Sequence, residues 1–405
     1  MKHKKKNGKW MKFRHSVVRN ILFPTLGMFT RVKYRVKIKK FKEQQKRPYL
    51  VLYNHQTTFD QFFVGMAFKG PLYYLASEDL FSNGFVSSII RYLVAPIPIK
   101  KSTSDVRAIL NCIKVSREGG TIAIAPEGNR TYSGKTEYMS PAIAPLARKL
   151  GVPIALFRIE GGYGVQPRWS DVVRKGKMKA YVSEVIYPEE YASMSDDELF
   201  AAIKQGLEVN EAVADASFKH RKLAEYLERA VYVCPFCGFS EHESRDDRLR
   251  CKTCGREVRY LPTKEIEGVG FDFPFRFMAE WYDYQADFVN STDMLLHKDA
   301  PIFEDCVDVY KVIPSKKKYL IEKSVPVSLY GDRVVIKFGA EELNCAFDDI
   351  TAAAVLGRNK LNLYHSTAIY QFKSSKRFNA LKYVHTYHRY KNIVEEKQDA
   401  KFLGL

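Results

Sequence analysis

His55 and Asp60 follow an apolar run in the stretch "YLVLYNHQTTFDQFFVG", which extends from residue 49 to residue 65. On a continuous helix, side chains five residues apart point about 140° away from each other, so these two can meet only across the start of a helix. There, Asp60 would accept a hydrogen bond from one imidazole nitrogen and fix the tautomer, and the other nitrogen could take a proton from a hydroxyl. A polar turn that contains both residues by coincidence is the alternative.

The stretch "APEGNRTYSGK", residues 125–135, follows a second apolar run, "TIAIA". Gly128 allows a ligand to approach the backbone closely, and the guanidinium of Arg130 matches a phosphate group with two parallel hydrogen bonds. Together with Glu127, this pattern predicts an anion-binding turn. An ordinary strand-to-loop turn with a surface ion pair is the alternative.

The segments around these stretches predict an α/β fold. Short apolar strands are expected in "RPYLVLYN", "PLYYLASEDLF", "GGTIAIAPEG" and "KLGVPIALFRIEGG", with a helix in "TSDVRAILNCIKVSREG". Nearly all-apolar strands that alternate with helices indicate a mostly parallel sheet flanked by helices. In such sheets the chemistry lies in loops beyond the carboxyl ends of the strands, where His55 and Glu127 are expected.

Taken together, the two stretches resemble a known family. "NHQTTFD" resembles the His-x4-Asp (HX4D) motif, and "PEGNR" the Pro-Glu-Gly-x-Arg motif, of the 1-acylglycerol-3-phosphate (lysophosphatidate) O-acyltransferases, within the glycerolipid acyltransferase superfamily. "APIPIKK" stands where that family has its second motif, and "VPIAL" resembles the fourth. The likeness covers roughly residues 10–215 and implies a glycerolipid acyltransferase-like fold.

The resemblance implies a reaction in phospholipid biosynthesis. His55, oriented by Asp60, would remove the proton from the sn-2 hydroxyl of 1-acylglycerol-3-phosphate. The hydroxyl oxygen would then attack the thioester carbonyl of acyl-CoA or of an acyl carrier protein. Arg130 and Lys101 would hold the acceptor's phosphate, while the other implied residues would shape the site. The residues implied to bind substrate are Lys101, Glu127, Gly128, Arg130 and Pro153.

Two departures from the family pattern leave the acceptor open. The second motif ends in "IKK" in place of an arginine, and lysine binds phosphate as a point charge without the two-pronged fit. The third motif has Ala125, Asn129 and Thr131 in place of the usual Phe, Thr and Ser. An acyltransferase with a different lysolipid acceptor therefore stays open, as does a non-catalytic lipid-binding or tethering protein with a degenerate domain.

The amino-terminal segment predicts contact with an anionic phospholipid surface. The chain has a formal charge of +19, and its first 42 residues include 15 Lys or Arg and no Asp or Glu. Trp10, Phe13, Val17 and Ile21 recur at helical spacing among cations, with Pro24 expected to bend or end the helix. A helix packed on the neighbouring domain is the alternative. Nucleic acid is not the expected partner, because the aromatic residues lie on one helical face and are not interleaved with the basic tract.

The chain shows no run of 18 apolar residues, so no transmembrane helix is predicted. We expect a cytoplasmic protein that is peripheral on the inner face of the membrane.

Four of the seven cysteines form two Cys-x-x-Cys pairs, Cys234 with Cys237 and Cys251 with Cys254, thirteen residues apart. This spacing predicts a small zinc ribbon with structural Zn²⁺, in a module with little core of its own. His242 is a candidate replacement ligand, although four thiolates suffice. The module's protein partner stays open. The remaining cysteines, Cys112, Cys306 and Cys345, are expected to be buried.

The last hundred residues are strand-rich with a closing helix, a pattern that loosely resembles pleckstrin-homology-like folds. His385 and His388 are expected on the surface of that helix. The predicted organisation is a basic membrane-contact segment (1–32), an acyltransferase domain (33–230), a zinc ribbon (231–262), a linker and helix (263–304) and a mostly β domain (305–405).

Overall fold

The computed structural model describes residues 8–42, 48–99, 105–314 and 316–397. Its chain divides into two compact units. The first unit runs to Glu127 and includes Met139–Glu160 and Met178–Val209. The second unit consists of Gly128–Tyr138, Gly161–Lys177 and the chain from Asn210 onward. Two loop segments, 128–138 and 161–177, and residues 210–230 of the predicted acyltransferase domain therefore belong to the same compact unit as the two Cys-x-x-Cys pairs.

A seven-stranded sheet organises the first unit, with the strand order β1-β7-β6-β2-β5-β3-β4. All neighbouring strands are parallel except β6 and β7, so the predicted mostly parallel sheet is confirmed. Strand β2 lies in the middle of the sheet, and its four residues are almost completely buried because both faces are covered. The strands are β1 (Val36–Ile38), β2 (Leu50–Tyr53), β3 (Leu72–Ser77), β4 (Ile97–Ile99), β5 (Thr121–Ile124), β6 (Ile154–Glu160) and β7 (Met178–Ile186).

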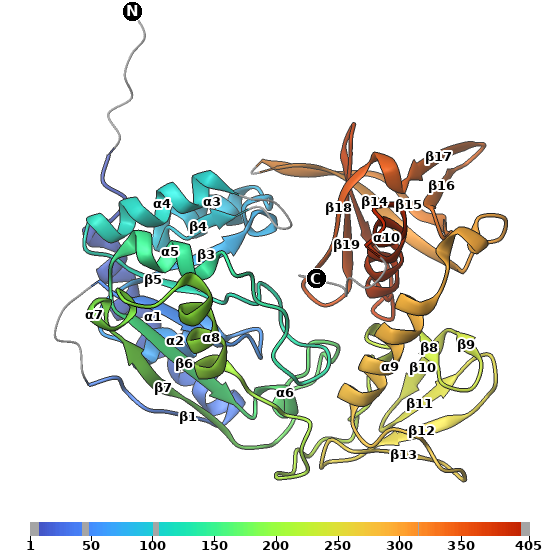
Figure 1. Cartoon of the computed structure of the whole chain (residues 1–405), viewed down its shortest axis with the longest axis horizontal. Helices are drawn as coiled ribbons and strands as arrows, with labels where there is room; N and C mark the ends of the chain where they lie inside the picture. The colour runs from blue at the N-terminus through green and yellow to red at the C-terminus, as the bar shows by residue number, and fades with distance from the viewer. Residues whose placement is uncertain (1–7, 43–47, 100–104, 315, 398–405) are drawn as a thin grey trace, which may run out of the picture. The chain divides into compact units, whose positions relative to one another are not determined.

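Helices cover both faces of this sheet (Figure 1). Leu50 and Leu52 pack in a core with α4 (Val106–Arg117), α5 (Ile143–Leu150) and α8 (Asp196–Leu207). Helix α2 (Asp60–Ala67) contacts β1 and β7, and α1 (Phe13–Tyr34) packs on α2 and on α3 (Phe85–Val94). Helix α1 continues past Pro24 to Tyr34. The short helices α6 (Gly162–Val165) and α7 (Pro188–Tyr191) lie in connections, α6 within the second unit.

The second unit is mostly antiparallel β structure. Its early strands are the pair β8 (Val233–Cys234) and β9 (Gly238–Phe239), and the four-stranded sheet of β10 (His242–Arg245), β11 (Arg248–Cys251), β12 (Glu257–Tyr260) and β13 (Ile266–Gly268). Helix α9 (Met278–Ser291) follows.

The carboxyl-terminal part is an antiparallel half-barrel, β17-β16-β15-β14-β20-β19-β18, with the closing helix α10 (Leu381–Val394). The predicted mostly β domain with a closing helix is therefore confirmed. Its strands are β14 (Phe303–Ile313), β15 (Lys317–Leu329), β16 (Arg333–Phe338), β17 (Glu341–Ala346), β18 (Ile350–Leu356), β19 (Lys360–His365) and β20 (Ile369–Lys373).

One continuous core joins the cysteine-bearing strands to the half-barrel. It includes Trp169 from a loop segment, Val233 and Tyr260 beside the cysteines, and Val327 and Tyr383 from the half-barrel and its helix. The expectation that the cysteine module has little core was therefore wrong. Its few apolar residues look insufficient in the sequence because the residues that bury them are distant in the chain.

Two single-residue expectations were also wrong. His385 is 1% exposed, and its Nδ1 is hydrogen-bonded with the hydroxyl of Tyr232, because α10 is buried along most of its length. Cys306 is exposed, since the alternation of β14 turns the adjacent Val307 inward. Cys112 and Cys345 are buried, as predicted.

Candidate active site and metal centre

His55 and Asp60 meet across the start of a helix. Strand β2 ends at Tyr53, His55 lies in the following turn, and α2 begins at Asp60. His55 Nδ1 lies 2.8 Å from Asp60 Oδ2. The structure thus brings together the two residues predicted to form a catalytic pair, in the turn-then-helix arrangement that their five-residue spacing required.

The carboxylate of Asp60 is completely buried and surrounded by donors. The backbone N–H of Gln56 donates to Oδ2 over 2.6 Å, and the N–H of Thr57 reaches both carboxylate oxygens at 2.9 Å. The Thr57 hydroxyl donates to Oδ1 over 2.6 Å. Such a donor set, in the first turn of a helix, fixes the position of the carboxylate.

This carboxylate determines which nitrogen of His55 can work as a base. When Nδ1 donates to Asp60, the basic lone pair of a neutral imidazole is on Nε2. The His55 side chain is 25% exposed, whereas that of Asp60 is fully buried. His55 can therefore receive a substrate's proton at Nε2 while Asp60 stabilises the imidazolium that forms.

Two further side chains hold the backbone around His55. The amide of Asn54 donates to the carbonyl of Ile159 over 2.8 Å and accepts from its N–H over 2.7 Å, joining the end of β2 to β6. Oε1 of Glu127 accepts from the backbone N–H of His55 over 2.9 Å. Asn54 was not predicted. A buried polar residue beside a histidine was the available signal, but its partner on β6 is visible only in the fold.

Tyr53 lies behind the pair, with its ring 6.2 Å from the His55 ring between centroids. Burial, together with the charge of Asp60, raises the pKa of the Tyr53 hydroxyl well above its usual range. Tyr53 therefore stays neutral beside the pair.

Gly128 and Arg130 belong to the second unit. Gly128 has φ +66°, a left-handed conformation that favours glycine. Arg130 is 7% exposed, and its carbonyl accepts a hydrogen bond from Arg168 Nη1 over 3.1 Å. The chain passes from the first unit to the second between Glu127 and Gly128, within the motif itself.

The structure does not bring Pro153 together with His55. The carbonyl of Pro153 accepts from Leu50 at the amino end of β2, whereas His55 follows its carboxyl end. Because each strand residue adds about 3.3 Å, Pro153 and His55 lie near opposite ends of the parallel strands. The other predicted phosphate ligand, Lys101, lies outside the described residues.

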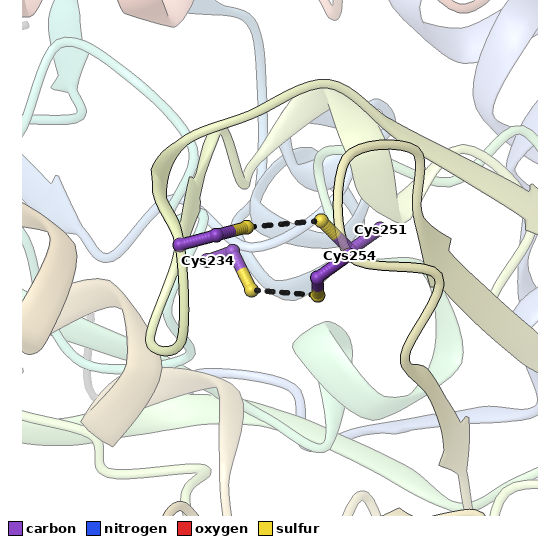
Figure 2. A group of neighbouring side chains, drawn as sticks. Cys234, Cys251 and Cys254 are labelled. Atoms are coloured by element: carbon purple, nitrogen blue, oxygen red, sulfur yellow. Dashed lines mark hydrogen bonds between the residues drawn. The ribbon is translucent and has the colours of Figure 1, made fainter.

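The four cysteines of the two Cys-x-x-Cys pairs converge (Figure 2). The Sγ atoms of Cys234 and Cys254 lie 3.8 Å apart, those of Cys237 and Cys251 lie 3.6 Å apart, and all four fall within 4.8 Å of one another. Cys234 is the last residue of β8, and Cys251 is the last residue of β11. Each Cys-x-x-Cys turn is followed by a glycine, Gly238 or Gly255, with φ +75°.

This geometry fits a tetrahedral metal ion. Zn–S bonds of about 2.3 Å correspond to S–S separations of about 3.8 Å on a tetrahedron, close to the separations of 3.8 and 3.6 Å found here. His242 is buried and packs edge-on against Trp281 at 5.7 Å between ring centroids. Among the described residues it is not part of the cysteine group, so the donor set is four thiolates.

Helix α1 presents apolar side chains outward. Phe13, Ile21 and Val32 are 85%, 62% and 68% exposed, whereas the buried positions of α1 are His15, Gly27, Thr30 and Tyr34. On the neighbouring α3, Phe85 is 80% exposed. We call these outward apolar side chains of α1 and α3 the apolar face; it comprises Phe13, Val17, Ile21, Met28, Phe29, Val32, Phe85, Val86, Ile89 and Tyr92.

Two cations of α1 contact neighbouring elements of the first unit. Arg14 stacks on the Tyr92 ring of α3 at 4.1 Å, and Arg19 donates to the carbonyl of Phe68. Trp10, expected in the apolar stripe, donates its indole N–H to the carbonyl of Ala95 over 3.0 Å. Within the described part of the chain, every helix is too short or too polar to cross a membrane.

Residues 33–159 match the protein family described as Acyltransferase. A 1-acyl-sn-glycerol-3-phosphate acyltransferase of Bacillus subtilis (strain 168) is 26% identical over 137 residues, which are 34% of this chain and 65% of the relative. The crystal structure of the 1-acyl-sn-glycerophosphate acyltransferase PlsC from Thermotoga maritima aligns with 49% of this chain and 80% of its own, at 23% identity and a TM-score of 0.40. The His55–Asp60 pair and Glu127 lie within the matched residues, so the family match agrees with the resemblance of the motifs.

Proposed function

We propose that this chain is a peripheral membrane enzyme that transfers an acyl group from an acyl thioester to the sn-2 hydroxyl of 1-acylglycerol-3-phosphate in phospholipid biosynthesis. The observation that carries the proposal is the imidazole of His55, hydrogen-bonded through Nδ1 to the buried carboxylate of Asp60, at the carboxyl end of a parallel strand. This is a base oriented for proton transfer within an acyltransferase-family segment.

The proposed reaction needs no covalent enzyme intermediate. His55 Nε2 takes the proton of the acceptor hydroxyl as its oxygen forms a bond to the thioester carbonyl carbon. The tetrahedral intermediate then collapses, the C–S bond breaks, and the imidazolium returns the proton to the leaving thiolate. The products are an ester and a free thiol, supplied by acyl-CoA or by an acyl carrier protein.

Arg130, with Lys101, is proposed to bind the acceptor's phosphate, and Gly128 to let the backbone approach it. A planar guanidinium can donate two parallel hydrogen bonds to a phosphate group, which supports the assignment of this role to Arg130. Glu127 is proposed to act on the same site by fixing the backbone of His55, because its carboxylate accepts the His55 N–H. A direct substrate contact of Pro153 is a prediction from the motif alone.

The cysteine cluster is proposed to hold a structural zinc ion, since four thiolates fill a tetrahedral coordination sphere and leave no open position for substrate. The apolar face is proposed to lie on the membrane. This helix exposes phenylalanine, isoleucine and valine while it buries histidine and threonine. Exposing this apolar area to water is unfavourable, and contact with a membrane interface would bury it. Basic residues of the amino-terminal segment would add attraction to anionic lipids.

The test is acyl transfer by the purified, zinc-loaded protein in anionic vesicles. Oleoyl and palmitoyl thioesters of coenzyme A and of acyl carrier protein would each be offered with a panel of lysolipids that includes lysophosphatidate. The proposal expects ester formation with lysophosphatidate as the preferred acceptor. Preference for another lysolipid would change the acceptor and keep the reaction. Folded protein that transfers nothing from any donor would favour a lipid-tethering role.

A further inference from the structure

Arg168 differs from the other buried charged residues because its guanidinium joins the third-motif loop, residues 128–135, to the half-barrel. We propose that Arg168 is a positioning residue for acceptor binding. In this inference, the half-barrel holds the loop of Arg130 in its phosphate-binding conformation through Arg168. The inference rests on the proposed function in one respect, namely that Arg130 binds the acceptor's phosphate.

The guanidinium of Arg168 reaches both partners at once. Nη1 donates to the carbonyl of Arg130 over 3.1 Å, and Nη2 lies 3.3 Å from Oδ1 of Asn129. On the other side, Nε donates to the carbonyl of Gly357 over 3.1 Å, and Nη2 to that of Val355 over 3.3 Å. Gly357 follows the end of β18 and Val355 lies within it, so one side chain ties the loop to that turn of the half-barrel.

Burial makes these contacts strong. Arg168 is 2% exposed, and its charged group stacks over the ring of Tyr132 at 4.3 Å. A buried cation needs its hydrogen bonds, because water cannot replace them. A planar fork with five N–H donors can serve four acceptors in two segments, whereas a lysine ammonium has three donors at a single point.

Other contacts anchor the same loop to the same unit. The Tyr132 hydroxyl donates to the carbonyl of Arg358 over 3.1 Å, and its ring stacks on Tyr282 of α9 at 6.4 Å. Lys135 forms an ion pair of 2.7 Å with Asp283, also on α9. Arg168 contacts the part of the loop that carries Arg130, whereas Tyr132 and Lys135 anchor the part that follows it in the chain.

The consequence concerns how the reaction depends on the second unit. The acceptor's phosphate would be bound by a loop whose backbone conformation is maintained by the half-barrel of the same unit. A change at Arg168 should therefore weaken acceptor binding and leave the acyl donor's binding unchanged. A purely structural arginine would lower stability without this selectivity.

The experiment compares Arg168→Lys with Arg174→Lys in the full-length, zinc-loaded protein. Arg174 is the matched control because it is equally buried in the same unit, and it bonds to the carbonyls of Gly164 and Leu223 and stacks on Trp169, not on the loop of Arg130. Two readouts are measured for each variant: the KM for lysophosphatidate and for acyl thioester, and amide hydrogen exchange of residues 128–134.

We expect Arg168→Lys to raise the acceptor KM about tenfold or more, as the loss of charge-assisted hydrogen bonds predicts, with the donor KM within about twofold of wild type. Exchange in 128–134 should accelerate by a similar factor. Arg174→Lys should leave acceptor KM and loop exchange near wild type, even where it lowers the melting temperature as much. Equal effects of the two variants on KM and exchange, or wild-type values in Arg168→Lys, would overturn the proposal.

The two readouts keep this inference apart from the proposed function. If the wild-type protein transfers no acyl group to any lysolipid, the proposed function fails by itself. The exchange comparison then decides whether Arg168 holds the loop: selective acceleration in Arg168→Lys supports the anchoring, and its absence overturns it.

Discussion

Four donors converge on the carboxylate of Asp60: the ring nitrogen of His55, the backbone N–H groups of Gln56 and Thr57, and the Thr57 hydroxyl. At the scale of single residues, the direction of these hydrogen bonds determines which side chain can occupy position 60. Every neighbour donates, so the side chain at position 60 must only accept. An ionised carboxylate is the side chain that satisfies this condition and also orients the His55 ring.

Asp60→Asn should therefore impair both catalysis and folding. The amide NH2 group would face other donors and turn the His55 tautomer, so kcat should fall roughly 10²- to 10⁴-fold, the range that a positioned acid–base group contributes. The free energy of unfolding should fall by about 1–3 kcal/mol because buried donors lose their acceptor. Steady-state kinetics and urea denaturation measure the two effects.

Thr57→Val is the matched control, because it removes one donor and leaves the carboxylate and His55 in place. Its kcat should stay within about tenfold of wild type. A wild-type kcat in Asp60→Asn would show that the carboxylate does not orient the base.

The contact between His55 and Asp60 could be predicted from the sequence because the two residues lie close together in the chain, where their spacing limits the geometry. The contact of Glu127 with the His55 backbone could not, since it depends on β2 and β5 being neighbours in the sheet. Arg168 was missed for the same reason. Its partners at 355–357 are nearly two hundred residues away, and no motif marks it.

At the scale of secondary structure, the sequence indicated the exposure of α1 but not the burial of α10. The apolar stripe of α1 was visible from helical spacing, and its exposure agrees with the membrane-contact alternative. By contrast, α10 reads as polar with its histidines, tyrosines and lysines, yet it is buried between β18 and α9. Periodicity cannot reveal that a polar helix is enclosed when its polar groups find partners in the fold.

The apolar face gives a prediction at this scale. Phe13→Glu with Ile21→Glu should reduce binding to anionic vesicles, because each change removes exposed apolar area and adds a charge that the membrane disfavours. A loss of about tenfold or more in the partition coefficient is expected. Vesicle co-sedimentation at fixed salt is the measurement.

The control places one glutamate in the second unit at Leu296, in the short helix Met294–His297 before β14, which is 78% exposed and lies outside the apolar face. Leu296→Glu should bind vesicles like wild type. Unchanged sedimentation of the α1 variant would show that this face does not contact the membrane.

Helix α10 gives a prediction about pH. Burial, with a smaller contribution from His388, lowers the pKa of His385 to about 3. The unfolded chain binds a proton at this residue below its usual pKa of 6.5, and the folded protein does not. The stabilising contribution is therefore complete above about pH 6.5 and decreases as the pH falls toward 3, by at most about 1.4 kcal/mol per pH unit.

His385→Gln keeps an acceptor for the Tyr232 hydroxyl and removes the titration. The difference in unfolding free energy between wild type and this variant should shift in favour of the variant between pH 6.5 and 4, measured by denaturant titration at each pH. Comparing two proteins with the same cysteine cluster cancels the effect of acid on metal binding. A difference that does not vary with pH would contradict the assigned shift.

For the whole molecule, the main finding is that the second unit has one core, shared by the loop segments, the cysteine-bearing strands and the half-barrel. The broad class was predictable, an α/β sheet followed by a β-rich part, because strand and helix patterns are local. The assignment of residues 128–138 and 161–177 to the second unit was not, since it depends on long-range packing.

This shared core predicts the effect of removing the zinc ion that we propose for the cysteine cluster. Chelation should destabilise the entire second unit and not the cysteine module alone, because Val233 and Tyr260 beside the cysteines pack in the common core. Losing several kcal/mol of metal-binding energy should lower the melting temperature by about 10 °C or more. Amide exchange should accelerate in the half-barrel strands as well as around the cysteines.

Metal analysis before and after chelation, with Cys254→Ser as a second way of weakening the site, completes that test. Accelerated exchange confined to residues 231–260 would show an independent module and contradict the shared-core account.

The central claim is that His55 is the base of an acyl transfer, and one measurement tests it most directly: the rate of ester formation from labelled acyl thioester and lysophosphatidate in vesicles by wild type, His55→Ala and His15→Gln. His15 is the control because it is also a histidine of the first unit, buried and hydrogen-bonded to Tyr73 at 3.1 Å, without a role in the reaction. The account predicts that His55→Ala loses transfer by about 10³-fold or more while His15→Gln retains it, with both proteins folded. Transfer by folded His55→Ala at the wild-type rate would contradict the claim.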